Sequence, residues 1–152
     1  MSACRKAYVL RKGRLSEVGQ VYSITCVTAD RGPVFACWQS ARALVAQLRA
    51  LHDAGDVESL AWVVMPDHLH WLFQLCRGDL ATIVCRMKAR SSLAINRRNG
   101  TCGRLWQKGY YDRALRREED LRSAARYIIM NPVRAGLVQK VGDYPFWDAI
   151  WL

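Results

Sequence analysis

The stretch LAWVVMPDHLHWLFQL (residues 60–75) decides the fold of this chain. Two apolar segments flank Pro66-Asp67, which predicts a hairpin of two antiparallel strands joined by a tight turn. Side chains alternate between the two faces of a strand, so His68 and His70 point to one face while Leu69 points into the core. Two imidazoles side by side on one face are half of a divalent-metal site.

The segments around this hairpin complete an α+β pattern. Hydrophobic periodicity and β-branched residues predict, in chain order, a strand at 21–28, a helix at 39–52, strands at 60–65 and 68–75, a helix at 79–96, a strand at 110–115 and a helix at 118–130. Asn131-Pro132 is expected to end the last helix, and the aromatic tail 143–147 to pack back on the core. This order predicts a ferredoxin-like or RRM-like βαββαβ sandwich, an antiparallel sheet with helices on one face, plus an added C-terminal helix.

Length and composition indicate one globular domain over residues 1–152, with a basic N-terminal arm over residues 1–19. The chain is 51% hydrophobic and 24% charged, which is a globular composition. Its longest apolar runs are far too short to span a membrane, and no apolar block follows the first residues, so we expect a cytoplasmic protein with no membrane partner. The six cysteines form no CxxC pair, which argues against a zinc ribbon and predicts free thiols.

The charge balance points to a polyanion as partner. Lys and Arg number 23 against 13 Asp and Glu, a net charge of +10, and nucleic acid is the leading candidate. The candidate DNA-binding residues are those of the arm and two residues that lie nearer the proposed site in sequence order, namely Arg5, Lys6, Arg11, Lys12, Arg14, Arg113 and Arg116. The alternative for any of them, and for the basic residues of the 79–96 helix such as Lys88, is a solvated surface.

Tyr127 and Asn131 supply what the histidine pair lacks. They are four residues apart near the end of the last helix, so they share one helix face. The Asn131 carbonyl is a hard ligand suited to Mg²⁺ or Mn²⁺, and the Tyr127 phenol can act as a nucleophile. If this helix packs beside the histidine strand, a metal held by His68, His70 and Asn131 and the Tyr127 phenol meet at one phosphodiester.

Other residues compete for these roles. Tyr110, Tyr111 and Tyr144 are also late in the chain, but neither Tyr110 nor Tyr111 has a carboxamide four residues on. As neighbours on a strand, Tyr110 and Tyr111 should point to opposite faces, one into the core and one into solvent. Turn chemistry fully accounts for Asp67 after Pro66, so we leave it out of the site; the alternative is that it orients an imidazole.

Three segments resemble the REP-associated tyrosine transposases, single-tyrosine relatives of the transposases of small insertion sequences. They are VVMPDHLH (63–70), LWQKGYYDR (105–113) and YIIMNPVRAGLV (127–138), and the resemblance covers the chain from about residue 5 to 150. His68-Leu69-His70 matches the two histidines around a hydrophobic residue that define the HUH motif. By position, Tyr127 matches the family nucleophile, and Asn131 matches the third metal ligand.

The resemblance implies an enzyme that nicks single-stranded DNA and transfers the strand through a 5′-phosphotyrosine intermediate, with Mg²⁺ or Mn²⁺ as cofactor. It implies REP-type hairpins as substrate and favours a monomer, although mobile-element relatives are dimers that exchange the tyrosine helix. Those relatives usually have Gln where this chain has Asn131. The competing interpretations are a non-catalytic hairpin-binding module on the same fold and a metallonuclease that uses water as nucleophile.

Overall fold

The computed structural model describes residues 16–150, and the five candidate arm residues (Arg5, Lys6, Arg11, Lys12 and Arg14) lie outside them. The described elements are β1 (Val21–Val27), α2 (Trp38–Asp53), β2 (Val57–Met65), β3 (His68–Leu75), α3 (Leu80–Asn99), β4 (Tyr111–Leu115), α4 (Glu118–Ile129), α5 (Asn131–Arg134) and β5 (Trp147–Ala149), with short 3-10 turns at Ala29–Arg31, Val34–Ala36 and Val141–Asp143. The strands of this part of the chain form one antiparallel sheet in the order β4-β1-β3-β2-β5. The predicted α+β class and order of elements are confirmed.

The β2–β3 hairpin lies at the centre of the sheet. Its register pairs Met65 with His68 and Val63 with His70, so the turn holds only Pro66 and Asp67. The carbonyls of both turn residues accept backbone N–H groups from the β1–α2 connection, which leaves neither carbonyl unsatisfied. The turn therefore fixes which residues of β3 face each side of the sheet.

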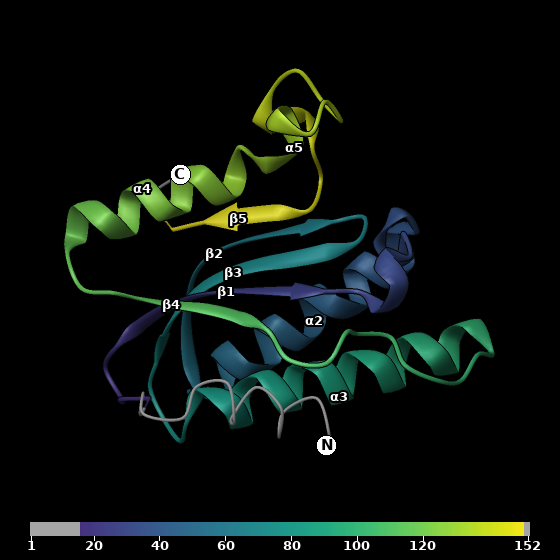
Figure 1. The fold of residues 1–152 in the computed structure, drawn as a ribbon, viewed down its shortest axis with the longest axis horizontal. Helices are drawn as coiled ribbons and strands as arrows, with labels where there is room; N and C mark the ends of the chain where they lie inside the picture. Colours follow the sequence, from purple (N-terminus) through teal and green to yellow (C-terminus); the bar gives the residue numbers. More distant parts are fainter. Residues whose placement is uncertain (1–15, 151–152) are drawn as a thin grey trace.

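Two hydrophobic cores cover the two faces of this sheet. On one face, α2 and α3 pack on the apolar side chains of β1, β2 and β3, among them the fully buried Leu69 and Trp71. On the opposite face, Ala125, Ile128 and Ile129 of α4 pack against β2, β3 and β5. Figure 1 shows α2 and α3 on one side of the sheet and α4 on the other. The added helix thus gives the sheet a second covered face.

The segment before β4 is held to the core by a buried lysine. Lys88 of α3 is only 6% exposed, and its ammonium donates to the carbonyls of Gln107 and Gly109. The indole of Trp106 donates to Ser91 Oγ at 3.0 Å, one turn further along α3. Burial lowers the pKa of Lys88. The prediction of a solvated helix face is wrong for Lys88, because the loop folds over it and supplies carbonyl acceptors.

Other boundaries also differ from the prediction. Helix α3 runs to Asn99, three residues beyond the predicted end, because Gly100 adopts a left-handed conformation (φ 64°) that ends it. Helix α4 ends at Ile129, one residue before its predicted end, and Asn131 then begins the short helix α5, which was not predicted. The aromatic tail includes a fifth strand, β5, which pairs with β2.

The cysteine prediction holds only in part. Cys26, Cys37, Cys76 and Cys102 are free thiols, whereas Cys85 is disulfide-bonded.

Within residues 16–150, the helices are all too short or too polar to cross a bilayer.

Tyr144 anchors the tail that carries β5, which gives a first prediction. Its hydroxyl donates to Val64 O at 2.6 Å, and burial raises the pKa of this phenol to about 12. Replacing Tyr144 by Phe leaves that carbonyl without its partner and should lower the free energy of unfolding by about 1–2 kcal/mol. Denaturant unfolding of the Tyr144→Phe variant measures this. Tyr111→Phe removes a hydroxyl from a side chain that is 73% exposed, and it should leave stability unchanged; equal losses in the two variants would contradict the anchoring role.

Candidate functional site

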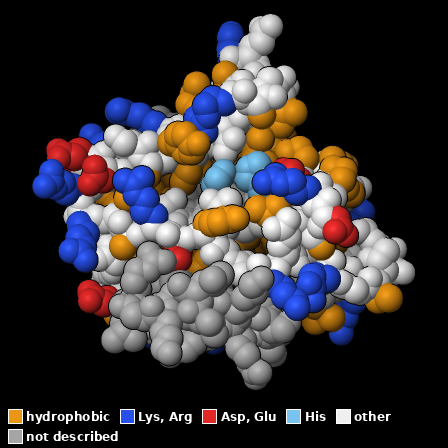
Figure 2. Space-filling model, viewed as in Figure 1, with side chains coloured by type: hydrophobic (Ala, Val, Ile, Leu, Met, Phe, Trp, Pro, Cys, Tyr) orange, Lys and Arg blue, Asp and Glu red, His pale blue; other side chains and the backbone are white. Residues whose placement is uncertain are grey.

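The two histidines of β3 face α4. Leu69 between them is fully buried in the α2–α3 core, and Leu72, two residues beyond His70, is buried in the α4 core. The rings of His68 and His70 lie edge to face, with centroids 4.8 Å apart. The prediction that both imidazoles share one face is therefore confirmed. Figure 2 shows histidine side chains in pale blue at the surface, with basic and hydrophobic side chains close by.

Each imidazole is held through its Nδ1 atom. His68 Nδ1 lies 2.7 Å from Asp67 Oδ1, and His70 Nδ1 lies 2.8 Å from Thr25 Oγ1 on the neighbouring strand β1. An ionised carboxylate only accepts hydrogen bonds, so His68 donates its Nδ1–H to Asp67. Within residues 16–150 the hydrogen bonds of both imidazoles are made through Nδ1, which leaves the Nε2 atoms for a ligand, the usual arrangement around metal-binding histidines.

Asp67 is more than a turn residue. Burial alone would raise the pKa of its carboxyl, but the hydrogen bonds and charges of His68 and Arg31 outweigh burial and hold that pKa below its usual value. Arg31 Nη1 lies 3.1 Å from Asp67 Oδ2. Turn chemistry alone therefore does not account for Asp67, because the same carboxylate lies in the turn and orients the imidazole of the next residue.

His70 is neutral at physiological pH. Burial, together with the smaller effects of the nearby charges of His68 and Arg134, lowers its pKa to about 4. A neutral imidazole keeps a lone pair on one nitrogen, which is what a metal ligand or a hydrogen-bond acceptor needs.

Tyr127 lies at the same cavity as His70. This cavity, here called the tyrosine cavity, has a volume of about 410 Å³ and lies between α4 and the sheet. Its lining residues come from β1, β3, β4 and α4 and are Ser23, Thr25, His70, Tyr111, Asp112, Arg113, Leu115, Asp120, Ser123, Ala124, Tyr127 and Ile128. The Tyr127 side chain is 61% exposed, so its phenol is accessible to a large substrate. The tyrosine helix thus packs beside the histidine strand, as the combined site required.

Arg134 holds the tyrosine from the other side. Its guanidinium carbon lies 3.9 Å from the centre of the Tyr127 ring, and its Nη2 donates to Tyr127 O at 2.7 Å. The same charge acts on His70. The sequence analysis assigned no role to Arg134. Its spacing of seven residues from Tyr127, which is two helical turns, could have indicated that the two side chains share a face.

Asn131 lies outside the cavity that Tyr127 and His70 share. It is the half-buried first residue of α5 and is joined to α4 through Met130, whose dihedral angles are near helical (φ −81°, ψ −3°). It does not line the tyrosine cavity. Within residues 16–150, His, Cys, Asp and Glu nowhere form a group of three that could hold a metal ion. Any ion at the histidine pair would therefore need amide, water or substrate oxygens as well.

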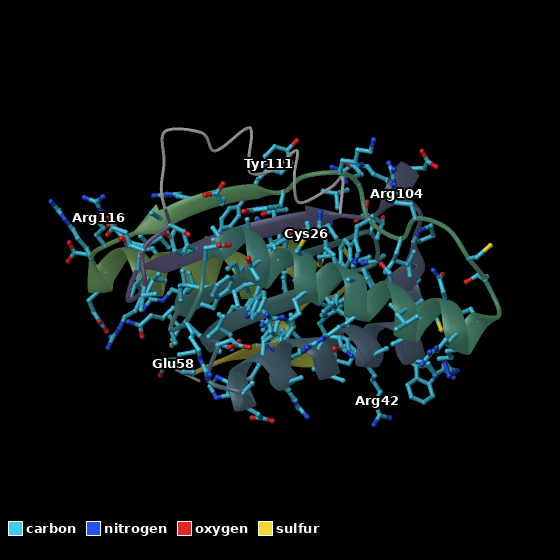
Figure 3. The ribbon with its side chains drawn as sticks, turned by 90° about the horizontal axis from the view of Figure 1, so that it is seen from below. Cys26, Arg42, Glu58, Arg104, Tyr111 and Arg116 are labelled. Atoms are coloured by element: carbon cyan, nitrogen blue, oxygen red, sulfur yellow. The ribbon has the colours of Figure 1, made fainter. Side chains whose placement is uncertain are left out.

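The two basic candidates beyond the arm differ in position. Arg113 is exposed on β4 and lines the tyrosine cavity, whereas Arg116 follows the end of that strand and does not. Figure 3 shows Tyr111 projecting outward from β4 and Arg116 at the far end of the strand. As predicted for adjacent strand residues, Tyr110 is buried and Tyr111 is exposed.

Comparisons with known protein sequences find a transposase family and two transposase relatives. The family model described as "Transposase IS200 like" matches residues 18–131. A REP-associated tyrosine transposase of Escherichia coli (strain K12) is 34% identical over 88 residues, which are 57% of this chain and 50% of the relative. A provisionally assigned REP-associated tyrosine transposase of Haemophilus influenzae is 29% identical over 100 residues, 59% of this chain and 57% of the relative. The matched segment thus spans only about half the length of either relative.

A solved structure extends this similarity to three dimensions. It is a REP-associated tyrosine transposase bound to a REP hairpin, with a TM-score of 0.74 and 26% sequence identity, and the match covers 88% of this chain and 79% of that one. The resemblance noted in the sequence is confirmed.

The hydrogen bonds of the imidazoles predict their tautomers. Neutral His68 should carry its proton on Nδ1, because Asp67 only accepts. His52, whose Nδ1 accepts the Ser59 N–H at 3.1 Å, should carry its proton on Nε2 and serves as an internal control. Long-range ¹H–¹⁵N correlation spectra distinguish the two forms, and the chain has only three histidines to assign. In the Asp67→Ala variant His68 should shift toward the Nε2–H form while His52 stays unchanged; an Nε2–H form of His68 in the parent protein would contradict the assigned bond.

Proposed function

Because the chain belongs to the family of IS200-like transposases, we propose that it cuts and rejoins single-stranded DNA through a covalent bond to Tyr127. The observation that carries this proposal is the shared cavity of Tyr127 and His70. An exposed phenol, two oriented imidazoles and a nearby arginine are the groups that phosphoryl transfer to a tyrosine needs: a nucleophile and groups that bind the phosphate.

In the proposed reaction, the Tyr127 oxygen forms a bond to phosphorus while the bond between phosphorus and the 3′ oxygen breaks. The phenolic proton passes to solvent, and the leaving 3′ oxygen takes up a proton. The products are a 5′-phosphotyrosine and a free 3′-hydroxyl. The new ester stores the energy of the broken one, so another 3′-hydroxyl can reverse the step and join a different strand.

The Arg134 guanidinium is placed to help this step. It fixes the position of the Tyr127 ring by stacking and by its bond to the Tyr127 carbonyl. Its remaining N–H groups are free to donate to a phosphate oxygen near His70, since a guanidinium has five such donors.

We propose Mg²⁺ or Mn²⁺ as cofactor, held by the Nε2 atoms of His68 and His70 and by the Asn131 amide oxygen. The two histidines fit this role, because both Nδ1 atoms are already engaged and His70 is neutral. When bound, the ion would polarise the phosphate and orient the leaving oxygen.

Hairpin-bearing single strands are the proposed substrate. The structural relative was solved with a REP hairpin, and the E. coli relative is named for the same repeats. The net charge of +10 supports binding to phosphates. Because Tyr127 and His70 of one chain line one cavity, we propose that the protein acts as a monomer, with its tyrosine in cis.

Covalent trapping tests the nucleophile. The substrate is a REP-type hairpin oligonucleotide with single-stranded flanks of randomised sequence, so that the enzyme selects its own cleavage site. With Mg²⁺ or Mn²⁺ the parent protein should give an adduct that survives a denaturing gel, EDTA should abolish it, and Tyr127→Phe should lose it completely. Tyr111→Phe is the matched control and should keep it. An adduct in Tyr127→Phe would refute the assignment of the nucleophile, and cleavage without any adduct would favour hydrolysis by water.

Mixing two inactive variants tests the cis arrangement. His70→Ala and Tyr127→Phe each remove one half of the site, so a mixture should remain as inactive as either variant alone if both halves belong to the same chain. The measurement is adduct yield in the mixture against that of the separate variants. Recovery of adduct on mixing would show that the tyrosine acts in the site of a second copy.

A further inference from the structure

The face of the sheet that bears the histidines is covered over only part of its width. Helix α4 packs mainly on β2, β3 and β5, and on β1 and β4 its core includes only the apolar pair Val21 and Leu115 at one end of these strands. The other side chains of β1 and β4 that line this face are polar or aromatic, namely Ser23, Thr25, Tyr111 and Arg113. Tyr111 is 73% exposed. An exposed aromatic ring on a polar sheet surface is a common means of binding an unpaired base.

The strand register places this surface directly beside the reacting groups. Thr25 pairs with His70 on one side and with Tyr111 on the other, so the three residues form one row across β3, β1 and β4. Two strand spacings separate the ends of the row, roughly 10 Å along the sheet. A nucleotide whose phosphate lies at His70 could therefore place its base toward Tyr111.

Helix α4 leaves room for a planar group. Asp120, Ser123 and Ala124 lie one or two turns before Tyr127 on the side of the helix that lines the tyrosine cavity. The small side chains of Ser123 and Ala124 leave space between the helix and the sheet unfilled, within a cavity of about 410 Å³. Leu115, Ala124 and Ile128 give this cavity an apolar part, and polar groups surround it.

The charges of the cavity select the kind of occupant. Asp120 of α4 lines it, and a carboxylate repels a phosphate. A base is uncharged, and its edge carries both donors and acceptors, which Asp120 and Arg113 can complement. The Asp120 carboxylate thus favours a base in the cavity, with the phosphate nearer the histidines.

We propose that the tyrosine cavity binds the unpaired base next to the scissile phosphate, with its ring stacked on Tyr111. Arg113, Asp120 and Ser123 contact the edge of that base and give the cleavage site its sequence preference. This proposal rests on the proposed function, because it takes the scissile phosphate to lie at Tyr127 and His70.

Fluorescence tests binding without requiring cleavage. The Tyr127→Phe variant binds a REP-type hairpin whose single-stranded flank carries 2-aminopurine at one position at a time. Stacking should quench the probe at one position of the flank. In Tyr127→Phe with Tyr111→Ala the quenching at that position should disappear, and with Tyr111→Phe it should remain. Trp38→Ala, which removes an aromatic ring that is 53% exposed on α2, is the matched control and should change nothing.

Cleavage kinetics then test whether the base contributes to the reaction. On the parent enzyme, an abasic site at the quenched position should slow adduct formation about tenfold, the size expected for loss of one stacked base. In Tyr111→Ala the intact and abasic strands should react at equal rates. Ser123→Leu, which fills the cavity from an exposed helix position, should also remove the difference while leaving the melting temperature unchanged.

The outcomes separate this proposal from the proposed function. Equal quenching at every position of the flank would refute the base site. Tyr111→Ala slowing the intact and abasic strands equally would also refute it. Neither result would contradict the proposed nicking activity. Absence of any adduct in the parent protein would refute the proposed function. The quenching experiment would still show whether the cavity holds a base.

Discussion

The structure depends on the two-residue turn between β2 and β3. Pro66 and Asp67 fix a register in which Val63 pairs with His70, and β3 lies in the interior of the sheet with cores on both faces. A shift of one residue would place both histidines in the α2–α3 core and Leu69 at the site. Burial of the leucines thus enforces the orientation of the imidazoles, and the hydrophobic effect that stabilises the fold also positions the chemistry.

Around this strand, the site is assembled from residues far apart in sequence. Thr25 contributes from β1, Asp67 from the turn, Tyr127 from α4 and Arg134 from α5. Their common effect is to fix side chains before any ligand arrives: two imidazoles through Nδ1 and one phenol ring through a stacked guanidinium. Such preorganisation reduces the conformational entropy that binding would otherwise cost.

The sequence was informative wherever a local pattern determines structure. Alternation in residues 60–75 was enough to predict the hairpin and the shared face of the histidines, and adjacency was enough to assign opposite environments to Tyr110 and Tyr111. The missed features depend on contacts between distant segments. Lys88 seemed solvated because its acceptors lie about twenty residues away, and the strand character of residues 147–149 appears only when β2 offers them an edge.

The placement of β5 also determines what the sheet exposes to other molecules. It covers part of the outer edge of β2, and Val64 of β2 is bonded both to the Phe146 carbonyl and to the Tyr144 hydroxyl. The opposite edge, β4, carries the charged residues Asp112 and Arg113 in its centre. A bare edge of hydrophobic strand is a template for intermolecular pairing, whereas charge on an edge opposes it. Pairing with β5 thus protects one edge and charge the other, which limits strand-to-strand aggregation.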